Sequence, residues 1–193
     1  MKQVVVIDNF DSFTFNLVDY LKQCDVNVMV YRNTVDFNII EDLQPDLIVL
    51  SPGPGNPQQA GKLIDYIKHF SEQVPIFGVC LGMQAITEAF GGSLRLLDQP
   101  KHGKSSLIEH DGKSIFAGIT NPAEVGRYHS LAVDLMPDDF EISASTKDGK
   151  DEVVMAMRHN TLPIEGVQFH PESVLSFKQQ VGLKMIQNLI AQL

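Results

Sequence analysis

The strongest constraint on the fold is an alternation of two hydrophobic patterns across the first 90 residues. Short runs rich in Val and Ile predict strands at 3–8, 26–32, 46–51 and 75–79. Between and after them, apolar residues recur three and four positions apart and predict helices at 13–24, 36–43, 59–70 and 81–90. Strands that alternate with helices are joined by right-handed crossovers, so we expect a parallel sheet that is covered on both faces.

The pattern changes after Gly91 and Gly92 to short strand-like runs. These runs are SLRLL, KSSLIEH, FEISAST, EVVMAMR and IEGVQF, and a last helix is predicted at about 175–192. We expect antiparallel strands that extend the parallel sheet or pack beside it. No linker, repeat or low-complexity tract divides the chain, so residues 1–193 are predicted to form one α/β domain.

Composition and charge narrow the classes of partner. Apolar residues make up 44% of the chain and charged residues 20%, as in a globular protein. The net charge of −9 argues against nucleic acid or an anionic membrane, because both need clustered Lys and Arg. The first apolar run ends at Asp8 and is too short for a signal sequence or a membrane span, so we expect a cytoplasmic protein. Small molecules and proteins remain as partners.

The segment GVCLGMQ, at 78–84, has the form of a nucleophile elbow, in which a reactive side chain lies between two glycines on a turn from strand to helix. Side chains at 78 and 82 would crowd this turn, and the start of the helix favours the thiolate of Cys80. The plain alternative is a small buried hydrophobic residue. The elbow alone leaves both interpretations open. Cys80 and the distant Cys24 are expected to be free thiols.

A candidate base for Cys80 occurs in the segment VQFHPES. Pro171 biases His170 toward an extended conformation, in which residues two apart point the same way, so Glu172 is expected to lie beside the imidazole. Such a carboxylate fixes the tautomer of a catalytic histidine. The alternative is a loop histidine with a solvated glutamate nearby. No Cys and His pair has the spacing of zinc ligands, and neither a metal nor another cofactor is predicted.

Three loops that follow predicted strands, DNFDSFT, SPGPGNP and GVCLGMQ, are expected to meet at one edge of the sheet. Glycines 53 and 55 let backbone amides approach a ligand, and one amide there is a candidate partner for the Leu81 amide in an oxyanion hole. SPGPGNP also suits a stiff turn, whereas a phosphate loop would end in Gly-Lys-Ser/Thr. In DNFDSFT, Asp11 or Ser12 is predicted to cap the following helix.

Together GVCLGMQ, SPGPG, RYHSL and GVQFHPES resemble the class I (triad) glutamine amidotransferases over essentially the whole chain. The segments IDNFDSFT, RN at 32–33 and HGK at 102–104 narrow the resemblance to the small glutaminase subunits of anthranilate synthase (component II) and aminodeoxychorismate synthase. This resemblance implies a flavodoxin-like three-layer α/β sandwich, with a mostly parallel central sheet and additional antiparallel strands.

The resemblance also implies roles for individual residues. Cys80 attacks the side-chain amide of L-glutamine and forms a thioester, His170 acts as base and then acid, and Glu172 orients the histidine. The amides of Gly53 and Leu81 form the oxyanion hole. Glutamine is then contacted by Gly53, Pro54, Gly55, Gln84, Ser130 and Leu131. Met83 stands where many members have His and has no assigned task.

A separate chorismate-using synthase subunit (component I) is the implied recipient of the ammonia, with the DNFDSFT and HGK segments facing it. Anthranilate synthase, in tryptophan biosynthesis, is favoured over the aminodeoxychorismate synthase of folate biosynthesis or a subunit shared by both. A cysteine peptidase, a thioesterase and a non-catalytic regulatory module are the alternatives from other classes. Gln84 together with SPGPG favours a small amino-acid amide over a peptide.

Overall fold

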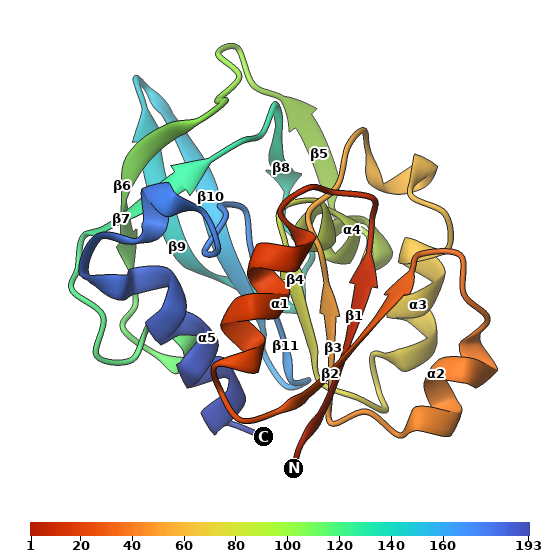
Figure 1. Cartoon of the computed structure of the whole chain (residues 1–193). Coiled ribbons are helices and arrows are strands. Elements are labelled where there is room, and N and C mark those ends of the chain that lie inside the picture. The colour runs from red at the N-terminus through yellow and green to blue at the C-terminus, as the bar shows by residue number, and fades with distance from the viewer.

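The alternation of strands and helices produces a sheet with helices on both faces (Figure 1). The computed structural model describes all 193 residues of the chain. The first half of the chain follows the predicted order closely. Its strands are β1 (Gln3–Asp8), β2 (Asn27–Arg32), β3 (Leu47–Leu50) and β4 (Ile76–Val79). Its helices are α1 (Thr14–Lys22), α2 (Phe37–Leu43), α3 (Leu63–Phe70) and α4 (Leu81–Ala89).

The second half adds strands β5 (Ser93–Leu96), β6 (Lys104–His110), β7 (Ala123–Arg127), β8 (Leu131–Leu135), β9 (Phe140–Asp148), β10 (Asp151–His159) and β11 (Ile164–Val167). The nine-stranded sheet has the order β2-β1-β3-β4-β11-β10-β9-β6-β7, and β5 pairs with β8 separately. The strands from β2 to β11 in this order are parallel, and the rest are antiparallel. The parallel part reproduces the flavodoxin-like order 2-1-3-4-5, so the fold prediction is confirmed.

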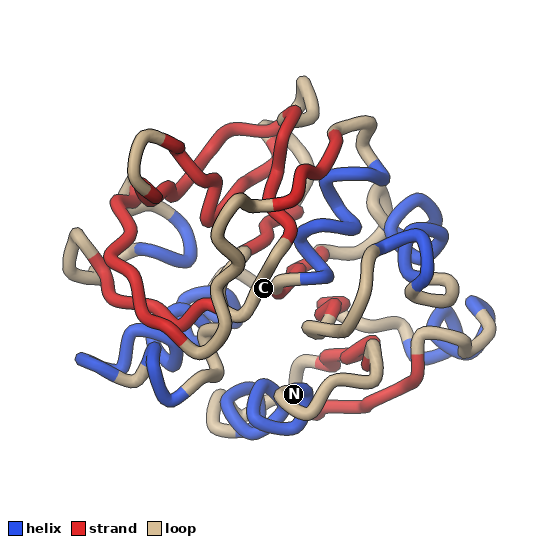
Figure 2. The backbone as a smooth tube through the Cα atoms, turned by 90° about the horizontal axis from the view of Figure 1, so that it is seen from above, coloured by secondary structure: helices blue, strands red, loops and turns tan.

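Helices pack on both faces of the parallel strands, as the view from above in Figure 2 shows. Val4 and Val6 of β1 pack in one buried cluster with residues of α1 and α5 (Val181–Ala191). Val5 and Ile7 of the same strand pack in a second cluster with residues of α2, α3 and α4. Because both faces are buried, β1 has no polar residue between its successive valines and isoleucine.

Three expectations from the sequence need correction, and two strands were not predicted. The last helix begins at Val181, not near 175, because Gln179 and Gln180 have φ of 56° and 57° and the preceding residues form two short 3-10 turns. Helix α3 begins at Leu63, not at 59, because Gly61 has a φ of 57°. Strand β11 is parallel to β4 as well as antiparallel to β10. Strands β7 and β8 lie outside the runs that predicted strands.

The loop between β1 and α1 is not capped as predicted. The residue before α1 is Phe13, which makes no side-chain capping hydrogen bond. Asp11 instead accepts a hydrogen bond from the Phe13 amide at 2.8 Å, and Ser12 makes no bond to the helix. The carboxylate of Asp8 holds the loop by accepting a hydrogen bond from the Thr14 hydroxyl at 3.0 Å. None of the helices is long and apolar enough to span a membrane.

Adjacent residues of α2 provide a test of this layered packing. Ile40 is fully buried in the cluster beneath α2, whereas the side chain of Ile39 is 41% exposed. We expect Ile40→Ala to lower the free energy of unfolding by about 2–5 kcal/mol and the matched Ile39→Ala to lower it by less than about 1 kcal/mol. Urea denaturation of both variants measures the difference, and equal losses would contradict the assigned orientation of α2.

Candidate active site

The loops that follow β1 and β3 are fastened together at the carboxyl edge of the parallel strands. The backbone amide of Asn9 donates to the Ser51 hydroxyl at 2.8 Å, and its side-chain amide donates to the Ser51 carbonyl at 2.8 Å. A Cβ atom at Gly53 would lie only 2.6 Å from the side chains of Asn9 and of Leu81. The expected meeting of the three loops is therefore found, with Gly53 directly beside the first residue of α4.

Cys80 occupies a strained turn between β4 and α4. It has φ 52° and ψ −102°, a conformation that residues other than glycine rarely adopt and that tends to occur at functional sites. A Cβ at Gly78 would lie 2.5 Å from the carbonyl carbon of Gly82, and one at Gly82 would lie 2.4 Å from the Leu50 carbonyl oxygen. Both glycines are thus required for the helix to pack this closely on the sheet.

His170 and Glu172 form a buried pair. Their Nδ1 and Oε1 atoms are 2.7 Å apart, and each residue is 3% exposed. The two side chains lie side by side as expected, but through a turn, since the Ser173 amide donates to the His170 carbonyl at 3.2 Å and Pro171 occupies the second position of that turn. The expectation of an extended chain through Glu172 was wrong.

Aromatic side chains from two other loops enclose the imidazole. The ring centroids of Phe13 and Tyr128 lie 5.3 and 5.0 Å from that of His170. Burial lowers the pKa of His170, but Cys80 and Glu172 together raise it well above its ordinary value. The Nε2 atom is buried and has no hydrogen-bond partner. The imidazole therefore stays protonated, and its Nε2 atom is available to exchange a proton with the thiol or with a substrate.

A cavity of about 160 Å³ adjoins the thiol of Cys80. Its lining contains every residue that the sequence proposed for contact with a substrate, together with two that it missed, Tyr128 and His129. The complete lining consists of Gly53, Pro54, Gly55, Cys80, Gln84, Tyr128, His129, Ser130 and Leu131. Both missed residues belong to the RYHSL segment, which was recognised as a motif but interpreted only at its last two positions.

His129 lines the cavity but is not placed to act as a base. Its Nε2 accepts a hydrogen bond from Arg127 Nε at 3.0 Å, so the ring proton lies on Nδ1, which donates to the Leu131 carbonyl at 2.8 Å. Burial, opposed only in part by that hydrogen bond, lowers the pKa of His129 to about 4. The ring stays neutral at pH 7 and both of its nitrogens are occupied.

Met83, which had no assigned task, is fully buried against β11. A Cβ at Gly166 would lie 2.9 Å from the Cβ of Met83. Gln84 is also buried, at 3% exposure. No group of three or more His, Cys, Asp or Glu side chains is arranged to hold a metal ion.

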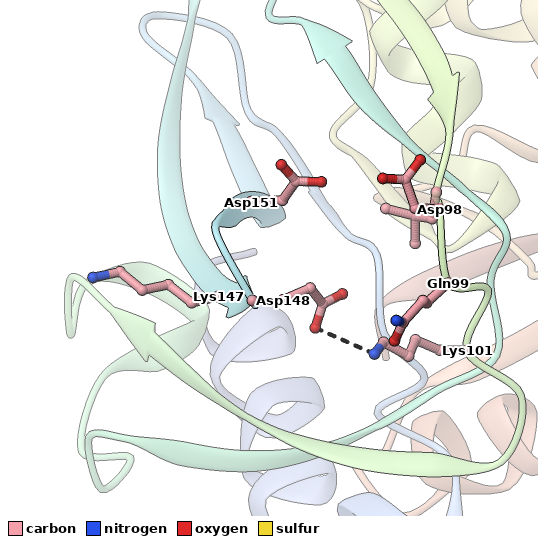
Figure 3. Close-up of a pocket in the computed structure, with 8 residues that line it drawn as sticks. Asp98, Gln99, Lys101, Lys147, Asp148 and Asp151 are labelled. Atoms are coloured by element: carbon pink, nitrogen blue, oxygen red, sulfur yellow. Dashed lines mark ion pairs between the residues drawn. The ribbon is translucent and has the colours of Figure 1, made fainter.

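A second cavity, of about 270 Å³, is lined by none of the proposed site residues (Figure 3). It is polar, and its lining consists of Leu97, Asp98, Gln99, Lys101, Lys147, Asp148, Gly149 and Asp151. Lys101 and Asp148 face each other at 3.4 Å. Asp148 also pairs with the fully buried Arg127 at 2.8 Å, which connects this cavity to the RYHSL segment.

The parallel sheet and the site at its carboxyl edge are those of an α/β enzyme. The chain belongs to the glutamine amidotransferase class-I family, whose sequence profile matches residues 5–190. It is 48% identical to the aminodeoxychorismate/anthranilate synthase component 2 of Bacillus subtilis (strain 168), over 97% of this chain and 95% of the relative. It is 45% identical to the anthranilate synthase component 2 of Methanocaldococcus jannaschii, over 98% of this chain and 97% of the relative.

The fold is also similar to that of a solved protein from Thermoplasma acidophilum, which carries a provisional assignment to GMP synthase. The TM-score is 0.86, the identity is 26%, and the match covers 100% of this chain and 95% of that one. The recognition of the family from its sequence motifs is therefore confirmed.

The two histidines near the thiol should titrate differently. We expect the His129 ring to remain neutral, with its proton on Nδ1, down to about pH 5, one unit above its pKa of about 4. His170 should carry a second proton at pH 7 and should lose it more readily in Cys80→Ser, because Cys80 is one of the two groups that raise its pKa. The nitrogen chemical shifts of the two imidazoles measure both protonation states. Titration of His129 near pH 6.5 would contradict the assignment of a neutral ring with its proton on Nδ1.

Proposed function

We propose that residues 1–193 act as one glutaminase domain, which hydrolyses L-glutamine and delivers the ammonia to a separate chorismate-using synthase subunit. One observation carries the proposal: the predicted glutamine contacts and Cys80 line a single cavity. Its volume of about 160 Å³ lies below the range of roughly 300–1,000 Å³ that is usual for drug-sized ligands. A cavity of this size favours a small amino acid over a peptide.

Cys80 acts as the nucleophile in the proposed reaction. His170 takes the proton of the thiol, and the resulting thiolate attacks the carbon of the glutamine side-chain amide. His170 then donates that proton to the nitrogen as the carbon–nitrogen bond breaks. Ammonia leaves and a glutamyl thioester remains. His170, now neutral, removes a proton from water, which attacks the thioester and releases glutamate and the thiolate. The free Nε2 of His170 supports this double role.

The remaining roles belong to Glu172 and to backbone amides. Glu172 holds the proton of His170 on Nδ1 and stabilises the imidazolium that the first step requires. The amide of Leu81 is in the first turn of α4, where amides have no partner within the helix, and Gly53 lies beside it. These two amides bind the oxyanion of the tetrahedral intermediates. Such donors contribute about 10²–10³-fold each to the rate in other acyl transfers.

The substrate lies along two backbone segments that line the same cavity. Residues 53–55 are one segment, Ser130 and Leu131 are the other, and Gln84 lines the cavity from helix α4. Backbone amides and carbonyls suit the ammonium and carboxylate groups of a free amino acid, which a peptide bond would remove. This arrangement disfavours a peptidase or a thioesterase, as does membership of the amidotransferase family.

We favour anthranilate synthase, an enzyme of tryptophan biosynthesis, as the synthase that receives the ammonia. The support comes from the relatives, since the Methanocaldococcus jannaschii protein is named for anthranilate synthase alone. The Bacillus subtilis relative is named for both products, so a subunit shared with aminodeoxychorismate synthase is the second candidate. Both relatives are called component 2, which supports a separate component 1 as the partner.

Removal of the thiol tests the nucleophile. We expect Cys80→Ser and Cys80→Ala to lower glutaminase activity at least about 10³-fold, because neither residue supplies a thiolate, while the circular dichroism spectrum stays unchanged. The matched Cys24→Ser variant should retain activity, since Cys24 is not part of the cavity lining. Glutamate and ammonia release from glutamine measure all three, and near wild-type turnover by Cys80→Ala would refute the assignment.

Addition of a synthase tests the coupling. We expect the isolated chain to hydrolyse glutamine poorly and a purified component 1 to stimulate it, because the ammonia has a use only in the complex. Assays for anthranilate and for aminodeoxychorismate, with glutamine as the only nitrogen donor, distinguish the two pathways. Full glutaminase activity of the chain alone, without stimulation by either kind of synthase, would count against a coupled role.

A further inference from the structure

The side chain of Gln168 contacts the thiol of Cys80. Gln168 follows β11 directly and is fully buried. Its amide nitrogen lies 3.6 Å from Cys80 Sγ, within the range of a hydrogen bond to sulfur. The motif VQFHPES was interpreted for its histidine and glutamate, and Gln168 had no task. The sulfur therefore has two polar neighbours, the NH₂ group of Gln168 and the imidazole of His170.

The orientation of the Gln168 amide follows from its neighbours. Its oxygen accepts a hydrogen bond from Gln84 Nε2 at 3.2 Å, and the same nitrogen of Gln84 donates to the Leu131 carbonyl at 3.4 Å. A backbone carbonyl can only accept, so the nitrogen of Gln84 must face Leu131. The oxygen of Gln168 must then face Gln84, and its NH₂ group is left to face the sulfur.

The Leu131 carbonyl is itself held in place by His129, which is bonded in turn to an ion pair. It accepts a second hydrogen bond from His129, whose other nitrogen accepts from Arg127. Arginine can only donate hydrogen bonds, so the direction of the hydrogen bonds on both sides of His129 is also fixed. Arg127 is fixed by two parallel bonds to Asp148, at 2.9 and 2.8 Å, beside the second cavity of Figure 3. The series of hydrogen bonds runs from this partly buried ion pair to the thiol.

We propose that Gln168 is a further catalytic residue, whose N–H group stabilises the thiolate of Cys80, and that Gln84 positions it. A hydrogen bond to an ionised acceptor is about twice as strong as one to a neutral acceptor, so the contact favours the anion. The thiolate is present twice in the reaction, before attack on the amide and when the thioester breaks. The inference rests on the proposed function only in assigning Cys80 as the nucleophile.

Few other titratable groups face the sulfur. His170 approaches from the turn after β11, with Glu172 behind it. Tyr128 and the neutral His129 face the cavity from the segment between β7 and β8. Helix α4 has no acidic or basic residue at the turn next to Cys80. A pH profile of thiol reactivity therefore reports the Cys80 and His170 pair, with Gln168 as the neutral donor beside it.

The test measures thiol reactivity without glutamine or a partner. In a Cys24→Ser background, the rate of alkylation by iodoacetamide is followed from pH 5 to pH 10 for Gln168→Glu and Gln168→Met. Gln168→Glu keeps an acceptor for Gln84 but replaces the donor with a negative charge, and Gln168→Met removes the donor without adding charge. Gln73→Glu, which adds the same charge on an exposed position, is the matched control.

We expect the rate at pH 7 to fall about 10-fold in Gln168→Met and further in Gln168→Glu, with recovery at high pH, and kcat for glutamine to fall in parallel. A shift of the profile by one pH unit corresponds to this 10-fold change. Gln73→Glu should match the parent. Folded variants with an unshifted profile would overturn the role of Gln168 and leave the glutaminase assignment, tested by Cys80→Ala, untouched. A merely structural role would lower the rate equally at every pH.

Discussion

The close approach of helix α4 to the parallel sheet determines the rest of the site. Gly82 packs against the Leu50 carbonyl and Gly78 against Gly82, so the helix begins immediately after the strand ends. In that turn Cys80 has a positive φ. The strain is held by burial of the helix face, including Met83 and Ile86, in the core. The backbone position of Cys80 is thus a result of the packing of α4 on the sheet.

The parts of the fold that follow from local pattern were predictable. Strand β1 was predicted to the residue, because a strand buried on both faces has an unbroken apolar run. The start of α5 was not, since the positive φ at Gln179 and Gln180 has no signal in residue type. Strand β11 is parallel to β4, whose paired residues are more than 80 positions away, and antiparallel to β10, whose paired residues are 7 to 11 positions away. Periodicity does not encode such pairings.

The candidate site likewise contains residues that the sequence predicts and residues that it does not. The motif residues Cys80 and His170 could be found because glycine spacing and a neighbouring carboxylate have a stated chemistry. Arg127 and Gln168 could not, because a polar residue in an apolar segment shows that a partner must exist but not which one it is. Their partners, Asp148 and Gln84, come from elements distant in the sequence. The available signal for Arg127 was a charged residue at the end of a five-residue strand, β7, in which Glu124 is the only other charged residue.

Both ends of the chain lie at the edge of the sheet that is opposite to the cavity. Lys2 pairs with Asp46, which directly precedes β3, and Leu193 lines a small cavity together with Pro75 and Ile76 at the start of β4. Figure 1 marks the two termini at this edge. The cavity opens where these strands finish. An affinity tag, a fluorescent reporter or a second enzyme can therefore be joined genetically at either terminus without blocking entry of the substrate.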